Sequence, residues 1–129
     1  LDRPETRARR AELLDECAAL AIGSRLERLS VAERLAGVFA RDRDEGYTAL
    51  AHWASWWRDI LLIAVGRDHQ ICNVDRRVEL ATVAMRFDAA SAVHVLRALR
   101  EARQALDANV NPRLALDALM LRLPVAVAR

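Results

Sequence analysis

The clearest hydrophobic pattern in the chain lies between Gly46 and Gly66, a stretch that holds all three tryptophans and the only tyrosine. At 3.6 residues per turn, its apolar positions form two stripes instead of one. The first stripe comprises Tyr47, Leu50, Ala54, Trp57, Leu61 and Ala64, and the second comprises Trp53, Trp56, Ile60 and Ile63. Because a surface helix needs only one apolar stripe, two stripes predict a central helix with neighbours on both sides.

Helical spacing of apolar residues continues on both sides of this stretch, without the alternation typical of strands. We expect a first helix over residues 4–22 and a second from Ser30, where Ser30 and Glu33 form a capping-box pattern. After a loop over residues 66–73, Asn73 is a suitable N-cap for a further helix. The apolar positions expected to face the core of that helix are Val74, Val78, Ala81 and Met85.

Two more helices are predicted in the last third of the chain. Asp88 is a suitable N-cap for a helix over residues 89–107, and Asn111 for a helix over residues 112–123 that begins with Pro112. The predicted fold is therefore all-α: one compact bundle of five to six helices around a central Trp-rich helix. Residues 1–129 are expected to form a single domain.

The last two helices have features of a subunit interface. The helix over residues 89–107 has an arginine-rich outer face, and the final helix is apolar over more surface than one neighbour can cover. Arginine suits interfaces because its planar fork pairs bidentately with carboxylates. A solvated outer face is the alternative interpretation for each arginine. The candidate interface residues are Arg97, Arg100, Arg103 and Met120.

Within the central helix, the three tryptophans are most simply explained as core. The adjacent charges Arg58 and Asp59 interrupt an otherwise apolar helix. They predict a buried polar tie to another helix or to a loop backbone, or else a contact with another subunit. The residues predicted to belong to the structural core are Trp53, Trp56, Trp57, Arg58, Asp59 and Asn111.

Composition narrows the range of functions. A chain of 129 residues with 53% hydrophobic and 29% charged residues predicts one domain with a sizeable core. All 20 cations are arginine, set against 18 anions, and a phosphate-binding loop of the usual type requires lysine. The mixed charges argue against a basic DNA-binding stripe. The longest apolar run, Ile60–Val65, is too short to cross a bilayer.

No residue set matches a catalytic or metal-binding pattern. Cys17 and Cys72 belong to no C-x-x-C pair, so we expect two reduced, buried thiols. Asp68, His69, Cys72 and Asp75 lie close together in sequence, but their spacing matches no known ligand pattern, and Asp75 is better explained as a carboxylate in the first turn of a helix. We therefore expect no catalytic residue, cofactor or metal ion.

Two segments together carry a family resemblance. One is Trp56–Leu62, followed by Gly66 and Asn73–Asp75; the other is Leu106–Leu123, which contains Asn109-Val110-Asn111-Pro112-Arg113. From about Ala11 onward, the chain resembles the C-terminal helical domain of the bacterial replicative clamp loader. It is most similar to the delta-prime subunit of that complex, and next to gamma/tau.

The resemblance implies a collar domain, one of five that close into a ring above the ATPase domains of a complex that loads the sliding clamp onto primed DNA. The implied partners are other clamp-loader subunits, with DNA and clamp contacted only indirectly, through domains missing here. It also implies a cytoplasmic location, no membrane contact and no enzymatic activity. The 129 residues would then be a C-terminal fragment of a longer chain.

Two other classes stay open. A helical ligand-binding or effector domain of a regulator would need an internal apolar pocket, around His52 and the tryptophans. A small α-helical enzyme would use Asp68, His69 and Cys72. A cavity inside the bundle favours the first class, and bound metal favours the second.

Overall fold

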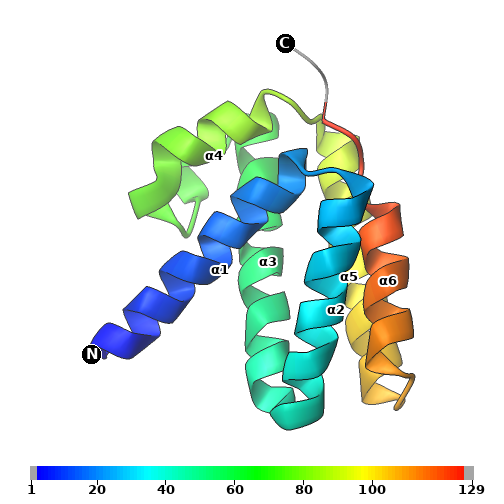
Figure 1. Ribbon diagram of the computed structural model, residues 1–129. Coiled ribbons are helices and arrows are strands. Elements are labelled where there is room, and N and C mark those ends of the chain that lie inside the picture. The colour runs from blue at the N-terminus through cyan, green and yellow to red at the C-terminus, as the bar shows by residue number, and fades with distance from the viewer. Residues whose placement is uncertain (1–2, 127–129) are drawn as a thin grey trace.

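The computed structural model describes residues 3–126, which form six α-helices and two short 3-10 turns, with no strand in that range (Figure 1). The predicted all-α bundle is confirmed. In chain order, the elements are α1 (Pro4–Ile22), α2 (Arg25–Arg41), α3 (Arg43–Ala64), η1 (Asp68–Gln70), η2 (Val74–Arg76), α4 (Arg77–Ala84), α5 (Ala89–Asp107) and α6 (Pro112–Arg122).

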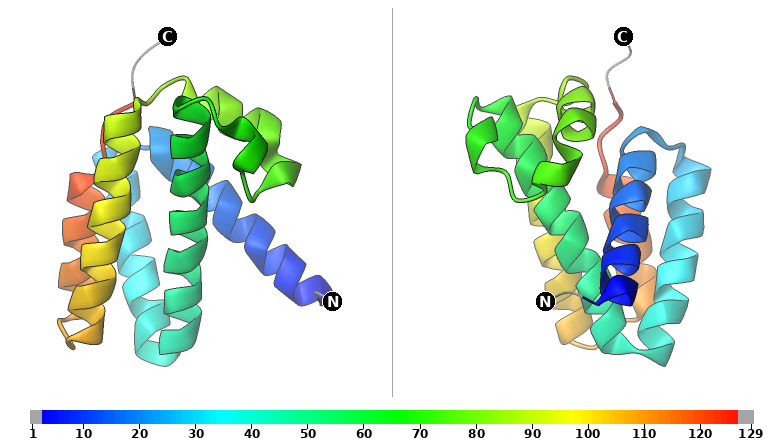
Figure 2. Two further views of the ribbon diagram at one scale, coloured as in Figure 1. Left: turned by 180° about the vertical axis from the view of Figure 1, so that it is seen from behind. Right: turned by 90° about the vertical axis from the view of Figure 1, so that its left-hand side faces the viewer.

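Four of the helices form a bundle in which each one packs on two others. Helix α2 packs on α3 and α6, and α5 also packs on α3 and α6. Helix α1 runs obliquely across α3, and the short α4 lies against α3 on the side away from α6 (Figures 1 and 2). Helix α3 therefore contacts α1, α2, α4 and α5, which agrees with the neighbours on both sides that its two stripes predict.

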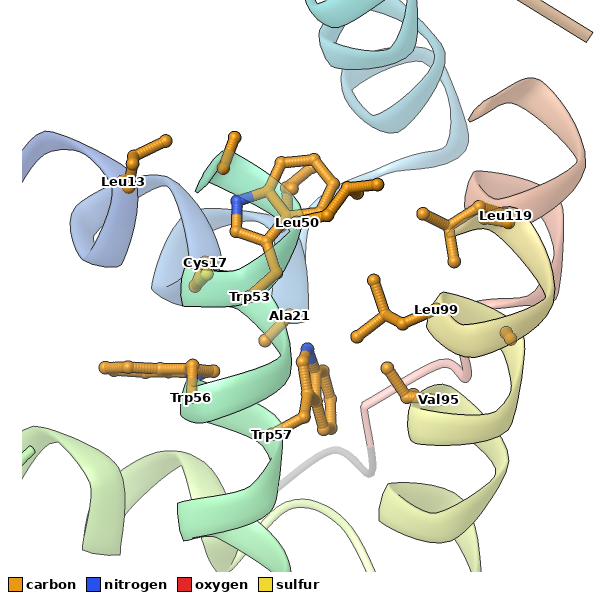
Figure 3. Packing of buried hydrophobic residues seen from close by; sticks show 14 of the residues in the cluster. Leu13, Cys17, Ala21, Leu50, Trp53, Trp56, Trp57, Val95, Leu99 and Leu119 are labelled. Atoms are coloured by element: carbon orange, nitrogen blue, oxygen red, sulfur yellow. The ribbon is translucent and has the colours of Figure 1, made fainter. Parts of the chain in front are cut away.

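The tryptophans of α3 lie in the core of the protein. Trp53, Trp56 and Trp57 are 3%, 0% and 4% exposed. Trp57 points toward α5, where Val95 and Leu99 lie, and Trp56 projects from the other side of α3 (Figure 3). Trp57 also meets the ring of Phe87 edge-on, with 5.1 Å between ring centroids. The three rings thus fill the space on both sides of α3.

Side-chain caps fix where most helices begin. Asp88 accepts a hydrogen bond from Ser91 N, and Asn111 accepts from Arg113 N and Leu114 N, as predicted. Helix α2, however, begins at a capping box formed by Ser24 and Glu27 and not at Ser30, which lies within the helix. Both serines have a glutamate three residues later, so the sequence pattern alone does not distinguish them.

The buried carboxylate of Asp59 holds the loop after α3. It accepts hydrogen bonds from Cys72 N at 2.9 Å, Asn73 N at 2.8 Å and Asn73 Nδ2 at 2.7 Å. The side chain of Asn73 also donates to Ser55 and accepts from Arg10 of α1. Asn73 therefore joins the loop to two helices, and its side chain makes no cap bond to η2, contrary to the prediction.

A second buried charge, Arg28 of α2, holds two helix ends. Its guanidinium donates to Leu20 O and Ala21 O at the end of α1, and to Leu123 O and Pro124 O after α6. Carbonyl groups at helix C-termini lack partners within the helix and carry partial negative charge, so they suit a buried cation. Burial lowers the pKa of Arg28, but guanidinium groups stay charged in proteins.

Helix α4 buries a different face from the predicted one. Leu80, Val83 and Ala84 are buried, whereas Val78 is 82% exposed and Val74 and Met85 are also exposed. Residues 74–76 form a 3-10 turn and the α-helix begins only at Arg77. Because a 3-10 turn has three residues per turn, it rotates the residues that follow relative to a continuous α-helix.

We predict that Trp57→Ala lowers the free energy of unfolding by about 3–5 kcal/mol, because it leaves a large cavity beside α5. Urea unfolding monitored by circular dichroism measures the loss. Val78→Ala, which shortens an exposed apolar side chain, is the control and should change stability by less than about 0.5 kcal/mol. A loss below about 1 kcal/mol for Trp57→Ala would contradict this packing.

We predict that Asp59→Ala costs about 3 kcal/mol of folding stability, because three donors lose their acceptor in a buried site. Asp68→Ala, in an exposed part of the same loop region, should cost less than about 0.5 kcal/mol. The same unfolding experiment compares the two variants. Equal free energies of unfolding for Asp59→Ala and Asp68→Ala would show that the loop does not depend on Asp59.

Candidate subunit interface

The predicted interface residues divide into two groups. Arg97, Arg100 and Arg103 are exposed on α5, as an interface requires. Met120, in contrast, is 2% exposed and lines the interior together with Leu119, so its assignment to the interface is wrong for this chain. The final helix exposes Leu114 and Leu121 instead; its many leucines made the buried face hard to identify from sequence.

An open apolar groove of about 180 Å³ runs between α3 and α5, directly beside the arginines. It exists because α3 presents two small residues, Ala51 and Ala54, where a larger side chain would fill the space. Its walls combine aliphatic side chains with two guanidinium groups. The lining residues are Leu50, Ala51, Ala54, Leu96, Leu99, Arg100 and Arg103.

One wall of this groove is fixed by Tyr47. The guanidinium of Arg103 lies over the Tyr47 ring, 4.4 Å from its centroid, and its Nε is 4.0 Å from Asp107. The Tyr47 hydroxyl donates to Asp107 at 2.7 Å. Arg43 donates to the same hydroxyl and to Leu106 O. Arg103 is therefore held in place by its own chain, as a cation stacked on an aromatic ring.

Arg97 and Arg100 differ from Arg103. Both are exposed, and neither makes a hydrogen bond or an ion pair with any residue in the described range 3–126. They lie three positions apart on α5, so they are neighbours on the helix surface. Their charges are consequently available to a ligand or partner, and Arg100 lines the apolar groove.

The remaining sequence candidates take other positions. Arg58 is exposed, 3.8 Å from the Cys72 sulfur, and Asn111 is exposed at the start of α6. Neither belongs to the core, so that part of the assignment is wrong. Asp59, the neighbour of Arg58, is 0% exposed and binds the loop backbone. Adjacent helix positions point 100° apart, which explains the different environments of the two charges.

The cysteines also differ from each other. Cys17 is buried, and burial, with the nearby charge of Glu16, raises the pKa of its thiol. Cys72 is exposed, which corrects the expectation of two buried thiols. Among the described residues, no group of three or more His, Cys, Asp and Glu side chains is placed to hold a metal ion.

No ligand-sized cavity lies beside the tryptophans. The internal space that Trp53 and Trp57 share with Cys17 measures about 10 Å³, the volume that one water molecule requires. A larger hollow of about 320 Å³ adjoins Arg28, but that side chain already donates to four backbone carbonyls. Among the described residues, the space beside the tryptophans is therefore too small to enclose an effector.

His52 of α3 lies on the side that faces α1. Burial lowers its pKa from the ordinary value of 6.5, and the charges of Arg10 and Arg9 lower it further. A lowered pKa means that the folded state binds a proton at His52 less readily than the unfolded state, so protonation of His52 favours unfolding. Its contribution to stability is present above the ordinary pKa and is lost as the pH falls through the lowered one.

Comparison with known families identifies what kind of domain this is. The family model described as DNA polymerase III, delta subunit, C terminal, matches residues 7–124. The chain belongs to this family. It is therefore the C-terminal domain of a clamp-loader subunit of DNA polymerase III. A search of curated proteins and a search of solved structures each gave no match.

The match covers every helix of the bundle, from the second turn of α1 to the end of α6. In the described part of the chain, no helix has the length and apolar character needed to cross a membrane. The family assignment agrees with the resemblance seen in the sequence, at the level of the clamp loader and DNA polymerase III.

Sequence reasoning found the arginines of the outer face but missed the groove beside them. The groove forms only because α3 and α5 lie side by side, and this tertiary packing cannot be read from the sequence. The available signal was the pair of alanines at positions 51 and 54, which interrupt a helix of large apolar residues. Small residues at i, i+3 on one helix face indicate a shallow surface wherever that face is not covered.

We predict that the three arginines of α5 differ in their effect on stability. Arg103→Ala should lower the free energy of unfolding by about 0.5–1 kcal/mol, because it removes the stacking on Tyr47. Arg97→Ala and Arg100→Ala should leave it unchanged within error, because neither side chain has a partner. Paired thermal melts of the variants measure the differences. Equal losses for all three would contradict this distinction.

Proposed function

We propose that this domain is the collar of a clamp-loader subunit, most similar to delta-prime, and that it joins the subunit to its neighbours in a five-membered ring. The family match over residues 7–124, to a model described by the delta subunit, carries the clamp-loader part of the proposal. The delta-prime identity rests on the resemblance of Trp56–Leu62 and Leu106–Leu123. The exposed groove supports the assembly role, together with Arg97 and Arg100, which have no partner among the described residues, because a protein that assembles with others needs a surface complementary to a partner.

In this proposal the domain contributes to DNA replication by assembly and not by catalysis. The complex would load the sliding clamp onto primed DNA with ATP, and the ATP would be bound elsewhere in the complex. A chain without lysine has no residue for the phosphate-binding loop that such ATPases use. Contact with DNA and clamp would be indirect, and the protein would work in the cytoplasm with the replication machinery.

The regulator alternative has less support. An effector domain needs a cavity that encloses a small molecule, typically of several hundred Å³. The space beside Trp53 and Trp57 is about 10 Å³. The enzyme alternative likewise lacks a convergent site, since Asp68 pairs weakly with Arg77 at 3.9 Å and Cys72 faces solvent.

We predict that the complete natural protein carrying these residues co-elutes with the other clamp-loader subunits of its organism in size-exclusion chromatography with light scattering. A truncated form that lacks the domain matching residues 7–124 should fail to enter the complex. Circular dichroism of the truncated form serves as the folding control. Assembly of the truncated form at wild-type affinity would overturn the proposed collar role.

A further inference from the structure

We propose that the α3/α5 groove receives an acidic amphipathic helix from a neighbouring subunit, whose apolar side chains enter the groove and whose carboxylates bind Arg97 and Arg100. This inference rests on the proposed function, since it specifies the partner of an assembly domain. It adds the secondary structure, the charge and the spacing of the acidic residues of the segment that docks.

The charge of this face requires an acidic occupant. Arg97 and Arg100 have no partner among the described residues. The carboxylate at the end of α5, Asp107, is already engaged by Tyr47 and Arg103. A partner with carboxylates would form charge-assisted hydrogen bonds to available guanidinium groups, and a basic partner would be repelled.

The groove floor indicates a helix and not an extended segment. Both walls are α-helices, whose backbone N–H and C=O groups in this region already bond within α3 and α5. An extended peptide laid on this surface would find no backbone partners for its own polar groups. A helix satisfies its backbone internally and offers an apolar stripe to the exposed aliphatic surface of Ala51 and Leu96.

The spacing of the arginines sets the spacing of the partner's acids. Arg100 lines the groove, and Arg97 lies three positions earlier on the exposed surface of α5. Two carboxylates three or four positions apart on a docked helix have a matching separation. Arg103 continues the row, but its stacking on Tyr47 leaves it less free to turn toward a partner.

Nucleic acid is a poorer fit to the same surface. Binding to single strands uses exposed aromatic rings for base stacking, yet the three tryptophans are buried and one face of Tyr47 is covered by Arg103. The groove floor is aliphatic and offers nothing to phosphate or base edges beyond two arginines. Acidic peptide matches both the apolar and the charged part of the site.

The test places a photo-crosslinking amino acid at exposed Ala51 of the complete natural protein, in a complex assembled from purified clamp-loader subunits. Mass spectrometry of the crosslinked peptide should identify a partner segment with helical periodicity and two carboxylates one turn apart. Arg97→Glu with Arg100→Glu should weaken assembly by about tenfold or more. Exchanging the two crosslinked carboxylates of the partner for arginine should restore it.

The matched control is Arg25→Glu with Arg67→Glu. These arginines are also exposed and unpaired among the described residues, and the double exchange alters the net charge by the same amount. The control should assemble like the wild type. Circular dichroism confirms that both double variants fold.

Three results would overturn the inference. They are wild-type assembly by Arg97→Glu/Arg100→Glu, a crosslink to a segment without paired acids, and binding of labelled DNA that the double exchange abolishes. If the wild-type protein itself fails to assemble with the other subunits, both the proposed function and this inference are contradicted. If the wild type assembles and the double variant does so equally well, the inference alone fails.

Discussion

The structure depends first on the buried carboxylate of Asp59. Helix α3 must be followed by a loop that turns back over it, and loops leave backbone N–H groups without helical partners. Asp59 accepts from two of those N–H groups and from the Asn73 side chain. Because Asn73 in turn accepts from Arg10, one carboxylate fixes the position of the loop and, through it, of α1.

Arg28, a buried cation, stabilises backbone carbonyl groups in the way that Asp59 stabilises backbone N–H groups. At the helix ends after α1 and α6, the groups in need of partners are carbonyls, and a guanidinium provides donors for four of them. Each of the two buried charges is therefore neutralised by backbone dipoles and not by an opposite side chain. Desolvation is the main cost of burying a charge, and at both sites hydrogen bonds to backbone groups offset it.

The tryptophans show how apolar burial outweighs a missing hydrogen bond. The indole N–H groups of Trp53 and Trp56 are buried without a partner in the described structure, at a cost of about 1–3 kcal/mol each. Burying an aromatic side chain of roughly 150–250 Å² gains about 4–6 kcal/mol. The balance favours the large ring even where its polar atom goes unsatisfied, so α3 keeps its tryptophans at the centre.

The sequence predicted those features that depend on local spacing. The two stripes of α3 and the caps at Asp88 and Asn111 are patterns within a few residues of each other, and they are found as expected. The prediction of which α4 residues are buried was wrong for a tertiary reason. The Asn73 side chain binds Asp59, fourteen residues away, and the chain enters α4 through a 3-10 turn. The assignment of Met120 to the interface was wrong because leucines lie on most sides of α6, so the sequence does not show which side is buried.

The arginines mark the limit of such predictions most clearly, because in this chain one residue type has several different roles. Arg28 is buried against carbonyls, Arg103 is held by an aromatic ring, and Arg97 has no partner in the described structure. Each assignment depends on residues brought near by tertiary folding, so all arginines look alike in the sequence. A guanidinium already satisfied within its chain has little to gain from a partner, whereas a free one beside apolar surface gains both charge pairing and burial. The same reasoning separates Arg97 and Arg100 from the structural arginines, and it is the reason for proposing the α3/α5 side of the bundle as the binding face.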